Sequence, residues 1–209
     1  LSNISGLKGL TRLKSLQLNG LTGSPDWASL QKLVQLRDLT LSGEKLTQPG
    51  PEVLSRLTKL KELSIACYGA SELQGLSNLS QLTSLTLTES KSLRSLSFLE
   101  TLQSLNHLKI EGYAGDSLEG IGRCQKITDL SITDAGKLED FSEVISLPDL
   151  CKLTLEGKFH DLDLDSLKTL ASLDTLDIRG AAKIRDVSAE DKSSDLSDID
   201  VHGFSSLGK

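Results

Sequence analysis

The sequence repeats one six-residue pattern nine times, and this repeat restricts the possible fold more than any other feature does. The pattern is Leu-x-x-Leu-x-Leu, with Ile or Val in place of some leucines, and it begins at residues 13, 36, 60, 82, 105, 127, 150, 173 and 196. Successive starts lie 22 to 24 residues apart. A regular interval of this length is typical of a solenoid, in which small repeated units stack along one axis.

Each repeat predicts one short β-strand and one short helical segment. Apolar and polar residues alternate in the second half of the pattern, which indicates a strand with one buried side. Upstream of most strands, apolar residues recur every three positions, as at Leu30, Leu33 and Leu36. This spacing predicts a helical or 3₁₀ segment that packs on the same core. One such unit cannot bury its own apolar side, but a stack of nine can.

These features resemble the leucine-rich-repeat family over essentially the whole chain. The resemblance implies an α/β solenoid, curved like a horseshoe, with a parallel sheet on the concave face and short helical or 3₁₀ segments on the convex face. We predict a single leucine-rich-repeat domain over residues 1–209, as a piece of a longer protein. Residues 186–209 are predicted to be an atypical polar last repeat, because Glu190 and Ser193 replace the usual apolar pair. A polar final unit is typical of a cap.

The positions that follow each strand carry two further predictions. Six of the nine repeats have glycine two residues after the last apolar residue of the strand, where the chain must turn. Many members of the family have asparagine at the next position, whereas this chain has none there. We therefore expect the loop amides and carbonyls to find other partners. Trp27 is expected to plug the convex loop over the second unit.

Charge and hydropathy argue against two classes of partner. The net charge is -6, whereas proteins that bind nucleic acid are usually basic. The acidic excess lies in residues 161–200, which contain eleven acidic and five basic residues. No apolar run approaches the roughly 18 residues of a membrane span. We predict neither nucleic-acid binding nor membrane insertion.

The cysteines and histidines provide no recognisable chemistry. Cys67, Cys124 and Cys151 have neither zinc-site spacing nor the even number of a disulfide framework, which favours a reducing compartment. The repeat register places His107 and His202 four units apart, too far to share a metal ion or a proton. We predict that the chain is not an enzyme and has no catalytic residues, metal site or cofactor.

The candidate binding residues are the side chains that the strand register points outward on the concave face. They are Glu62, Ser64, Ser84, Thr86, His107, Lys109, Asp129, Ser131, Lys152, Thr154, Asp177, Asp198 and Asp200. Four aromatic residues in the loops after the strands either contact a ligand or pack the loops. They are Tyr68, Tyr113, Phe159 and Phe204.

A narrower resemblance covers Leu13–Leu73. The segments LQLNG, SPDW, SLQKLVQLRDLTLSGEKL and VLSRLTKLKELSIACYGASEL are similar in order and spacing to the C-terminal repeats of plant coiled-coil NLR immune receptors. The segment LKIEGYAG, which begins at Leu108, adds to this likeness, although Pro49-Gly50-Pro51 stands where the family often has Asp-Pro-Leu.

This resemblance implies a function in plant defense. The repeat domain would be the ligand-sensing and autoinhibitory part of a cytoplasmic receptor, and its protein ligand would be a pathogen effector or an intramolecular nucleotide-binding module. Two alternatives stay open at this point. The chain could be an extracellular leucine-rich-repeat adhesion or recognition protein, which cysteine-rich caps would identify, or the substrate-selecting arm of an enzyme whose catalytic part is absent here.

Overall fold

The computed structural model describes residues 3–43, 47, 49–66, 73–159, 162–181, 184–185 and 198–202. One strand forms in each of the nine predicted repeats. These strands are β1 (Ser15–Leu18), β2 (Asp38–Leu41), β3 (Glu62–Ala66), β4 (Ser84–Thr88), β5 (His107–Glu111), β6 (Asp129–Thr133), β7 (Lys152–Phe159), β9 (Thr175–Ala181) and β11 (Asp198–His202).

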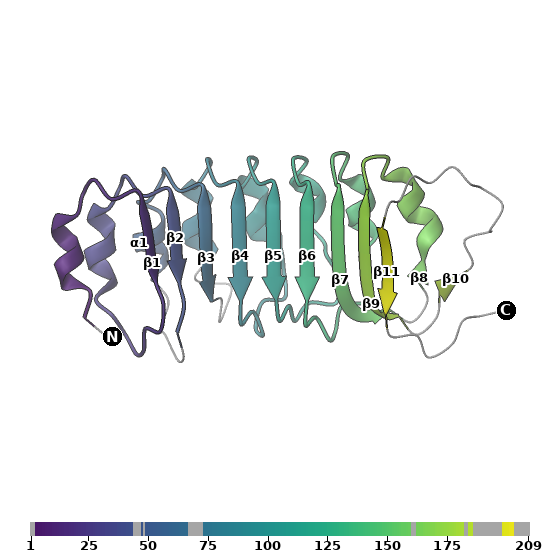
Figure 1. The fold of residues 1–209 in the computed structure, drawn as a ribbon, viewed down its shortest axis with the longest axis horizontal. Helices are drawn as coiled ribbons and strands as arrows, with labels where there is room; N and C mark the ends of the chain where they lie inside the picture. Colours follow the sequence, from purple (N-terminus) through teal and green to yellow (C-terminus); the bar gives the residue numbers. More distant parts are fainter. Residues whose placement is uncertain are drawn as a thin grey trace.

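The nine strands form one parallel sheet in chain order, as the repeat predicts. Figure 1 shows them side by side along the length of the molecule. Two further strands, β8 (Leu162–Asp163) and β10 (Ile184–Arg185), pair in a separate two-stranded sheet that the repeat pattern does not predict.

A short helical turn precedes each of the strands β1–β7 and β9, and Figure 1 shows several of these turns behind the sheet. They are η1 (Ser5–Gly9), η2 (Trp27–Lys32), α1 (Pro51–Leu54), η3 (Gln74–Asn78), η4 (Ser97–Thr101), η5 (Ile121–Arg123), η6 (Ser142–Ser146) and η7 (Leu164–Thr169). Seven of these are 3₁₀ helices, which confirms the interpretation of the three-residue spacing. No helix in the described part of the chain combines the length and the apolar character that a membrane crossing requires.

The core lies between the sheet and the helical turns. Leu30, Leu33 and Leu36 are fully buried, as their spacing predicts. In the sheet, equivalent residues stack directly on each other, so that Leu108 of β5 pairs with Leu85 of β4 and with Leu130 of β6. Burial of each such leucine is worth about 1.5–3 kcal/mol, so the fold depends on stacking between repeats.

The turn at the end of five of the described strands, β1, β4, β5, β6 and β9, uses the left-handed backbone conformation, and two of these repeats lack glycine there. Gly20 and Gly112 have φ angles of 68° and 82° at this position. Glu89 and Asp134 occupy the equivalent position in two other repeats, with φ angles of 53° and 50°. In these repeats the turn therefore forms with or without glycine, and glycine is the residue that adopts it with least strain.

The loops find backbone partners where the family often has asparagine. The Ser90 amide donates to the carbonyl of Glu111 (2.9 Å), which ends the next strand. The Ala135 amide donates in the same way to the carbonyl of Glu156 (3.2 Å). Hydrogen bonds between successive repeats thus satisfy these loop amides, as we expected.

Trp27 plugs the loop region next to the second repeat. The indole is 8% exposed at the start of η2. Its Nε1–H donates to the carbonyl oxygen of Thr47 at 2.7 Å. The ring is therefore part of the core and holds the loop that follows β2, which confirms the structural interpretation of this residue. Apart from β11, the predicted last repeat, residues 186–209, lies outside the described residues.

Candidate protein-binding surface

The outward side chains of strands β1–β7 and β9 form two long rows and a shorter third row, and the surface that they make is called the sheet face below. In the first two rows each of these strands contributes one residue, because the pairing is parallel and in register. The first row contains Ser15, Asp38, Glu62, Ser84, His107, Asp129, Lys152 and Thr175. The second row contains Gln17, Thr40, Ser64, Thr86, Lys109, Ser131, Thr154 and Asp177.

The two candidate aspartates of the last strand extend these rows. In β11, the backbone of Asp198 pairs with Thr175, and that of Asp200 pairs with Asp177. The register therefore aligns the backbone of all the candidate positions of the sheet in two rows of one sheet.

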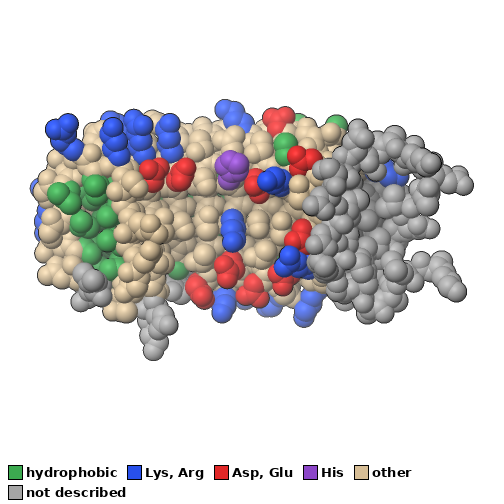
Figure 2. Space-filling view, viewed as in Figure 1, with side chains coloured by type: hydrophobic (Ala, Val, Ile, Leu, Met, Phe, Trp, Pro, Cys, Tyr) green, Lys and Arg blue, Asp and Glu red, His purple; other side chains and the backbone are tan. Residues whose placement is uncertain are grey.

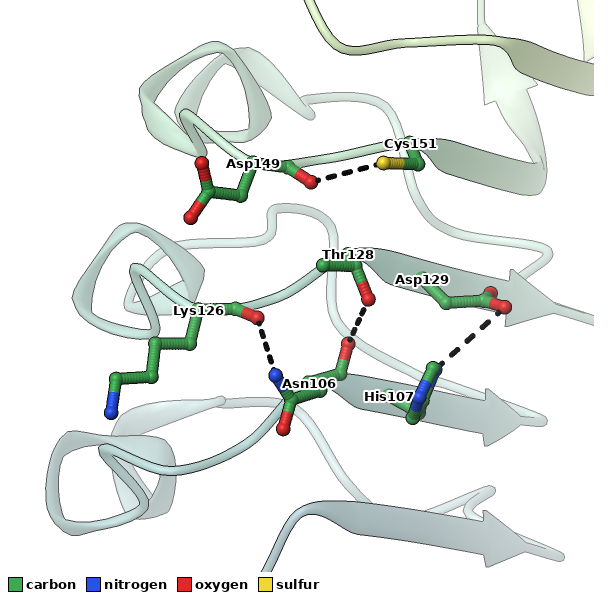
Figure 3. Close-up of polar contacts among 7 residues, drawn as sticks. All are labelled: Asn106, His107, Lys126, Thr128, Asp129, Asp149 and Cys151. Carbon is green, nitrogen blue, oxygen red and sulfur yellow. Dashed lines mark hydrogen bonds and ion pairs between the residues drawn. The ribbon is translucent and has the colours of Figure 1, made fainter.

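The centre of the sheet face, His107, Asp129 and Lys152, places an imidazole, a carboxylate and an ammonium group on successive strands. His107 of β5 and Asp129 of β6 are neighbours, with Nδ1 and Oδ2 3.9 Å apart, and Figure 3 shows the two side chains facing each other. This distance is too long for a hydrogen bond. Lys152 of β7 is the next residue in the row. Because exposed ion pairs contribute little to stability, these groups can exchange their partners at small cost.

Asp177 differs from the other candidates because a neighbour on its own strand already holds it. Nε and Nη2 of Arg179 donate to the two carboxylate oxygens of Asp177 at 3.1 and 2.8 Å. A two-point contact of this kind fixes the guanidinium as well as the carboxylate. The pair therefore acts as one unit, and a ligand of Asp177 would also meet Arg179.

Hydrogen bonds at the amino ends of β5 and β6 fix the backbone next to His107 and Asp129, the first residues of these strands. The carbonyl of Asn106 accepts from the amides of Thr128 (2.8 Å) and Asp129 (3.1 Å) and from Thr128 Oγ1 (3.3 Å). Asn106 Nδ2 donates to the carbonyl of Lys126 (3.3 Å), and Figure 3 shows this network beside the two strands. The backbone under the charged centre is therefore held by both repeats.

The half of the sheet face over β1–β4 is richer in hydroxyl groups. Thr40, Ser64 and Thr86 are half-buried neighbours in the second row. No aromatic side chain belongs to the rows in the described strands. Since aromatic anchors usually supply much of the binding energy at an interface, affinity on this face must come from a broad contact.

Sequence reasoning missed a third row. Its members are Thr88, Glu111, Thr133, Glu156 and Arg179, each two residues beyond the second row on its own strand. The six-residue template stops at the last apolar residue, whereas β3–β7, β9 and β11 continue past it; in β3 the extra residue is the buried Ala66. The alternation of polar and apolar residues for one more step, as in Ser84–Thr88, was the signal for this row.

Two of the four aromatic candidates are buried. Tyr113 and Phe159 are each 2% exposed. The Tyr113 hydroxyl donates to the carbonyl of Ser117 at 2.9 Å, and Phe159 packs edge-to-face on Phe141, with ring centroids 5.3 Å apart. Both rings therefore pack the loops, which is the second of the two roles that the sequence leaves open for them. Tyr68 and Phe204 lie outside the described residues.

Burial also changes the acidity of two groups. Desolvation, with a smaller effect from the negative charge of Asp116, raises the pKa of Tyr113 to about 12. Burial raises the pKa of the Cys124 thiol to about 11, and Cys124 Sγ lies 3.5 Å from the carbonyl oxygen of Leu99. Both groups are neutral at physiological pH, so Cys124 is a core residue and not a nucleophile. The described residues contain no group of three or more His, Cys, Asp or Glu side chains that could hold a metal ion.

Comparison with known proteins identifies the fold. No protein-family model and no curated protein sequence matches the chain. Among solved structures, it is similar to an internalin from Listeria monocytogenes, with a TM-score of 0.76 and 23% identity over 96% of this chain and 57% of that one. It is also similar to an internalin C2 from the same organism, with a TM-score of 0.72 and 21% identity over 97% of this chain and 82% of that one. The chain thus spans little more than half the length of the first of these proteins, and with its parallel sheet and 3₁₀ turns it has the leucine-rich-repeat solenoid fold.

Proposed function

We propose that this chain is a protein-recognition scaffold that binds a protein partner on its sheet face and catalyses no reaction of its own. The observation that carries this proposal is the set of exposed polar side chains held in register on one parallel sheet. A continuous apolar core backs that sheet. Side chains on such a rigid base lose little backbone freedom when a partner binds, which favours affinity.

The charged centre of the sheet face is the proposed core of the contact. His107, Lys109 and Lys152 are exposed, and Asp129 lies between them in the register. A partner must match this order of charges, because like charges placed opposite each other oppose binding. The charged centre therefore supplies specificity, while the hydroxyl groups over β1–β4 add contact area.

The partner contact can be tested with three substitutions. In the triple variant His107→Ala, Lys109→Ala and Lys152→Ala, we expect binding of the purified partner to weaken at least about tenfold, because three central contacts are lost together. Affinity capture from an extract of the source organism would supply the partner, and isothermal titration calorimetry would measure the affinity.

A control variant changes three basic residues elsewhere on the surface. Arg94, Arg123 and Lys137 are exposed and lie outside the rows of the sheet face. Their replacement by alanine should change the affinity by no more than about twofold. Equal affinity of the wild-type chain and the sheet-face variant would refute the proposed contact.

We further infer that the scaffold is the ligand-sensing and autoinhibitory repeat domain of an intracellular NLR-type immune receptor. Its ligand would be a pathogen effector or the receptor's own nucleotide-binding module. The resemblance of Leu13–Leu73 to plant coiled-coil NLR repeats supports this inference. Cys124 and Cys151 are free thiols, which agrees with a cytoplasmic location, because the cytoplasm keeps thiols reduced.

The transcript that encodes this chain distinguishes the intracellular receptor from the extracellular alternative. Upstream of the Leu1 codon, the receptor proposal predicts a phosphate-binding loop followed by helical modules. A signal peptide and a cysteine-rich cap in that position would contradict it and would favour an extracellular recognition protein.

A further inference from the structure

Five cationic side chains gather at the amino-terminal ends of the first three strands. They are Arg12, Lys14, Arg37, Lys59 and Lys61, and together they are called the basic strip below. Figure 2 shows lysine and arginine side chains along this edge, at the upper left of the view. Each of these cations is next to the first leucine of its own repeat, and the stacking of the repeats brings these positions side by side.

The backbone of the basic strip is fixed by hydrogen bonds between repeats. The carbonyl of Lys14 accepts from the amides of Arg37 (2.7 Å) and Asp38 (3.1 Å). The carbonyl of Arg37 accepts from the amides of Lys61 (2.7 Å) and Glu62 (3.0 Å) in the same way. The backbones of Lys14, Arg37 and Lys61 therefore lie about one strand spacing apart, roughly 4.8 Å.

The charges of the basic strip are not neutralised within the described part of the chain. All five side chains are exposed, and none forms an ion pair within 4.0 Å. Lys59 donates from Nζ to Oε1 of Gln35 at 2.8 Å, a contact with a neutral group that leaves its charge in place. Like charges on neighbouring strands repel each other. An anionic partner would remove this repulsion.

The surface beside these cations is hollowed and partly apolar. A surface hollow of about 440 Å³ is lined by Thr11, Arg12, Lys14, Val34 and Gln35. Val34 is 42% exposed, and Leu10, which directly precedes Thr11 in the chain, is 50% exposed. An occupant of this surface therefore gains from an apolar side chain as well as from negative charges.

The dimensions and surroundings of the basic strip favour a short peptide. In the later described repeats the residue after the first apolar position is neutral or acidic, as at Thr83, Asn106 and Asp174. The residue before that position is basic only at Lys126, so cations lie on adjacent strands only in the first three repeats. Two strand spacings, roughly 10 Å, match about three residues of extended chain. Because Asp38 and Glu62 directly follow the cations Arg37 and Lys61, a broad polyanion such as duplex DNA would meet these acids as well.

We propose that the basic strip is a docking site for a short acidic segment of a partner polypeptide, with an apolar residue of that segment placed in the hollow beside Val34. The site lies on the amino-terminal edge of β1–β3, away from the charged centre of the sheet face. The proposal is therefore independent of what the sheet face binds.

The test uses charge reversal and a synthetic probe. The probe is a fluorescein-labelled peptide of alternating glutamate and glycine with one central leucine, and fluorescence anisotropy measures its binding. We expect the wild-type chain to bind it, and the variant Lys14→Glu, Arg37→Glu and Lys61→Glu to bind at least about tenfold more weakly. The same peptide with glutamine in place of glutamate should not bind the wild-type chain.

A control variant separates the basic strip from the overall charge. The changes Arg94→Glu, Arg123→Glu and Lys137→Glu alter the net charge by the same amount, and we expect them to change the affinity by no more than about twofold in physiological salt. If charge reversal unfolds the chain, as judged by circular dichroism, the same residues of both variants are changed to glutamine instead of glutamate.

Three results would overturn the proposal. The first is no binding of the glutamate peptide to the wild-type chain. The second is an equal loss of binding in the strip variant and the control variant. The third is tighter, strip-dependent binding of a DNA duplex or of phosphatidylglycerol vesicles than of the peptide, which would assign the strip to a different class of ligand.

Discussion

At the scale of single residues, the turn after each strand shows where the sequence fits the fold least well. Glu89 and Asp134 adopt φ angles of 53° and 50° at a position where other repeats have glycine. The left-handed conformation costs an ordinary L-residue about 1–2 kcal/mol, and aspartate tolerates it better than glutamate does. The strain should therefore be larger at Glu89.

Replacement of Glu89 by glycine should stabilise the chain. Glycine removes the backbone strain but loses more chain entropy on folding, so we expect a net gain of about 0.5–1 kcal/mol in the free energy of unfolding. The exposed ion pair of Glu89 with Lys91, at 3.6 Å, contributes little against this gain. Urea unfolding measures the effect, and Glu119→Gly, at an exposed loop residue without positive φ, should instead destabilise the chain. A loss of stability in Glu89→Gly would contradict the account of this turn.

Tyr113 should make stability depend on pH in the alkaline range. The folded-state pKa of its hydroxyl is about 12, above the ordinary value of 10.0, so the folded chain keeps this proton where the unfolded chain has lost it. The resulting stabilisation is present below pH 10 and is lost as the pH rises from about 10 to about 12.

The variant Tyr113→Phe isolates this effect from other titrations. It also loses the hydrogen bond to Ser117, so at pH 9 we expect it to be about 1 kcal/mol less stable than the wild-type chain. The difference should narrow above pH 10, because only the wild-type chain then loses the contribution of its phenol. Urea unfolding across this pH range measures it, and a difference that stays constant would argue against the raised pKa.

At the scale of the elements, the sequence predicted most of the fold because each repeat carries its own evidence. Alternation located the strands, and the three-residue spacing located the 3₁₀ turns, since both patterns follow from which side of an element is buried. Two features were not predictable in this way. The burial of Tyr113 depends on the loop around it, and β8 and β10 pair through residues that do not belong to the repeat pattern.

The stacking of equivalent leucines predicts that substitutions on the buried side of the sheet lower stability far more than substitutions on its outward side. Leu108→Ala should destabilise the chain by about 2–5 kcal/mol, because Leu108 is 1% exposed and stacks between Leu85 and Leu130. Thr86→Ala, on the outward side of β4, should change stability by less than about 0.5 kcal/mol. Thermal unfolding followed by circular dichroism measures both, and similar effects would mean that the buried and exposed sides are wrongly assigned.

At the scale of the whole molecule, the parallel stack converts sequence periodicity into rows of surface residues. The first two rows of the sheet face could be predicted because one register holds at their positions in every described repeat. The contacts within them could not, since the pairing of Asp177 with Arg179 depends on side-chain conformation. The basic strip was also missed, although its signal lay in the second position of the six-residue pattern, where Lys14, Arg37 and Lys61 align.

Differential acetylation of lysine tests the proposed binding face most directly. The chain is labelled alone and in complex with its purified protein partner, and mass spectrometry compares the labelling of each lysine. We predict that Lys109 and Lys152 on the sheet face become protected in the complex. Lys126 and Lys137 are also exposed but lie in the loops, and we expect their labelling to stay unchanged. Protection of Lys126 and Lys137 with unchanged labelling of Lys109 and Lys152 would contradict recognition by the sheet face.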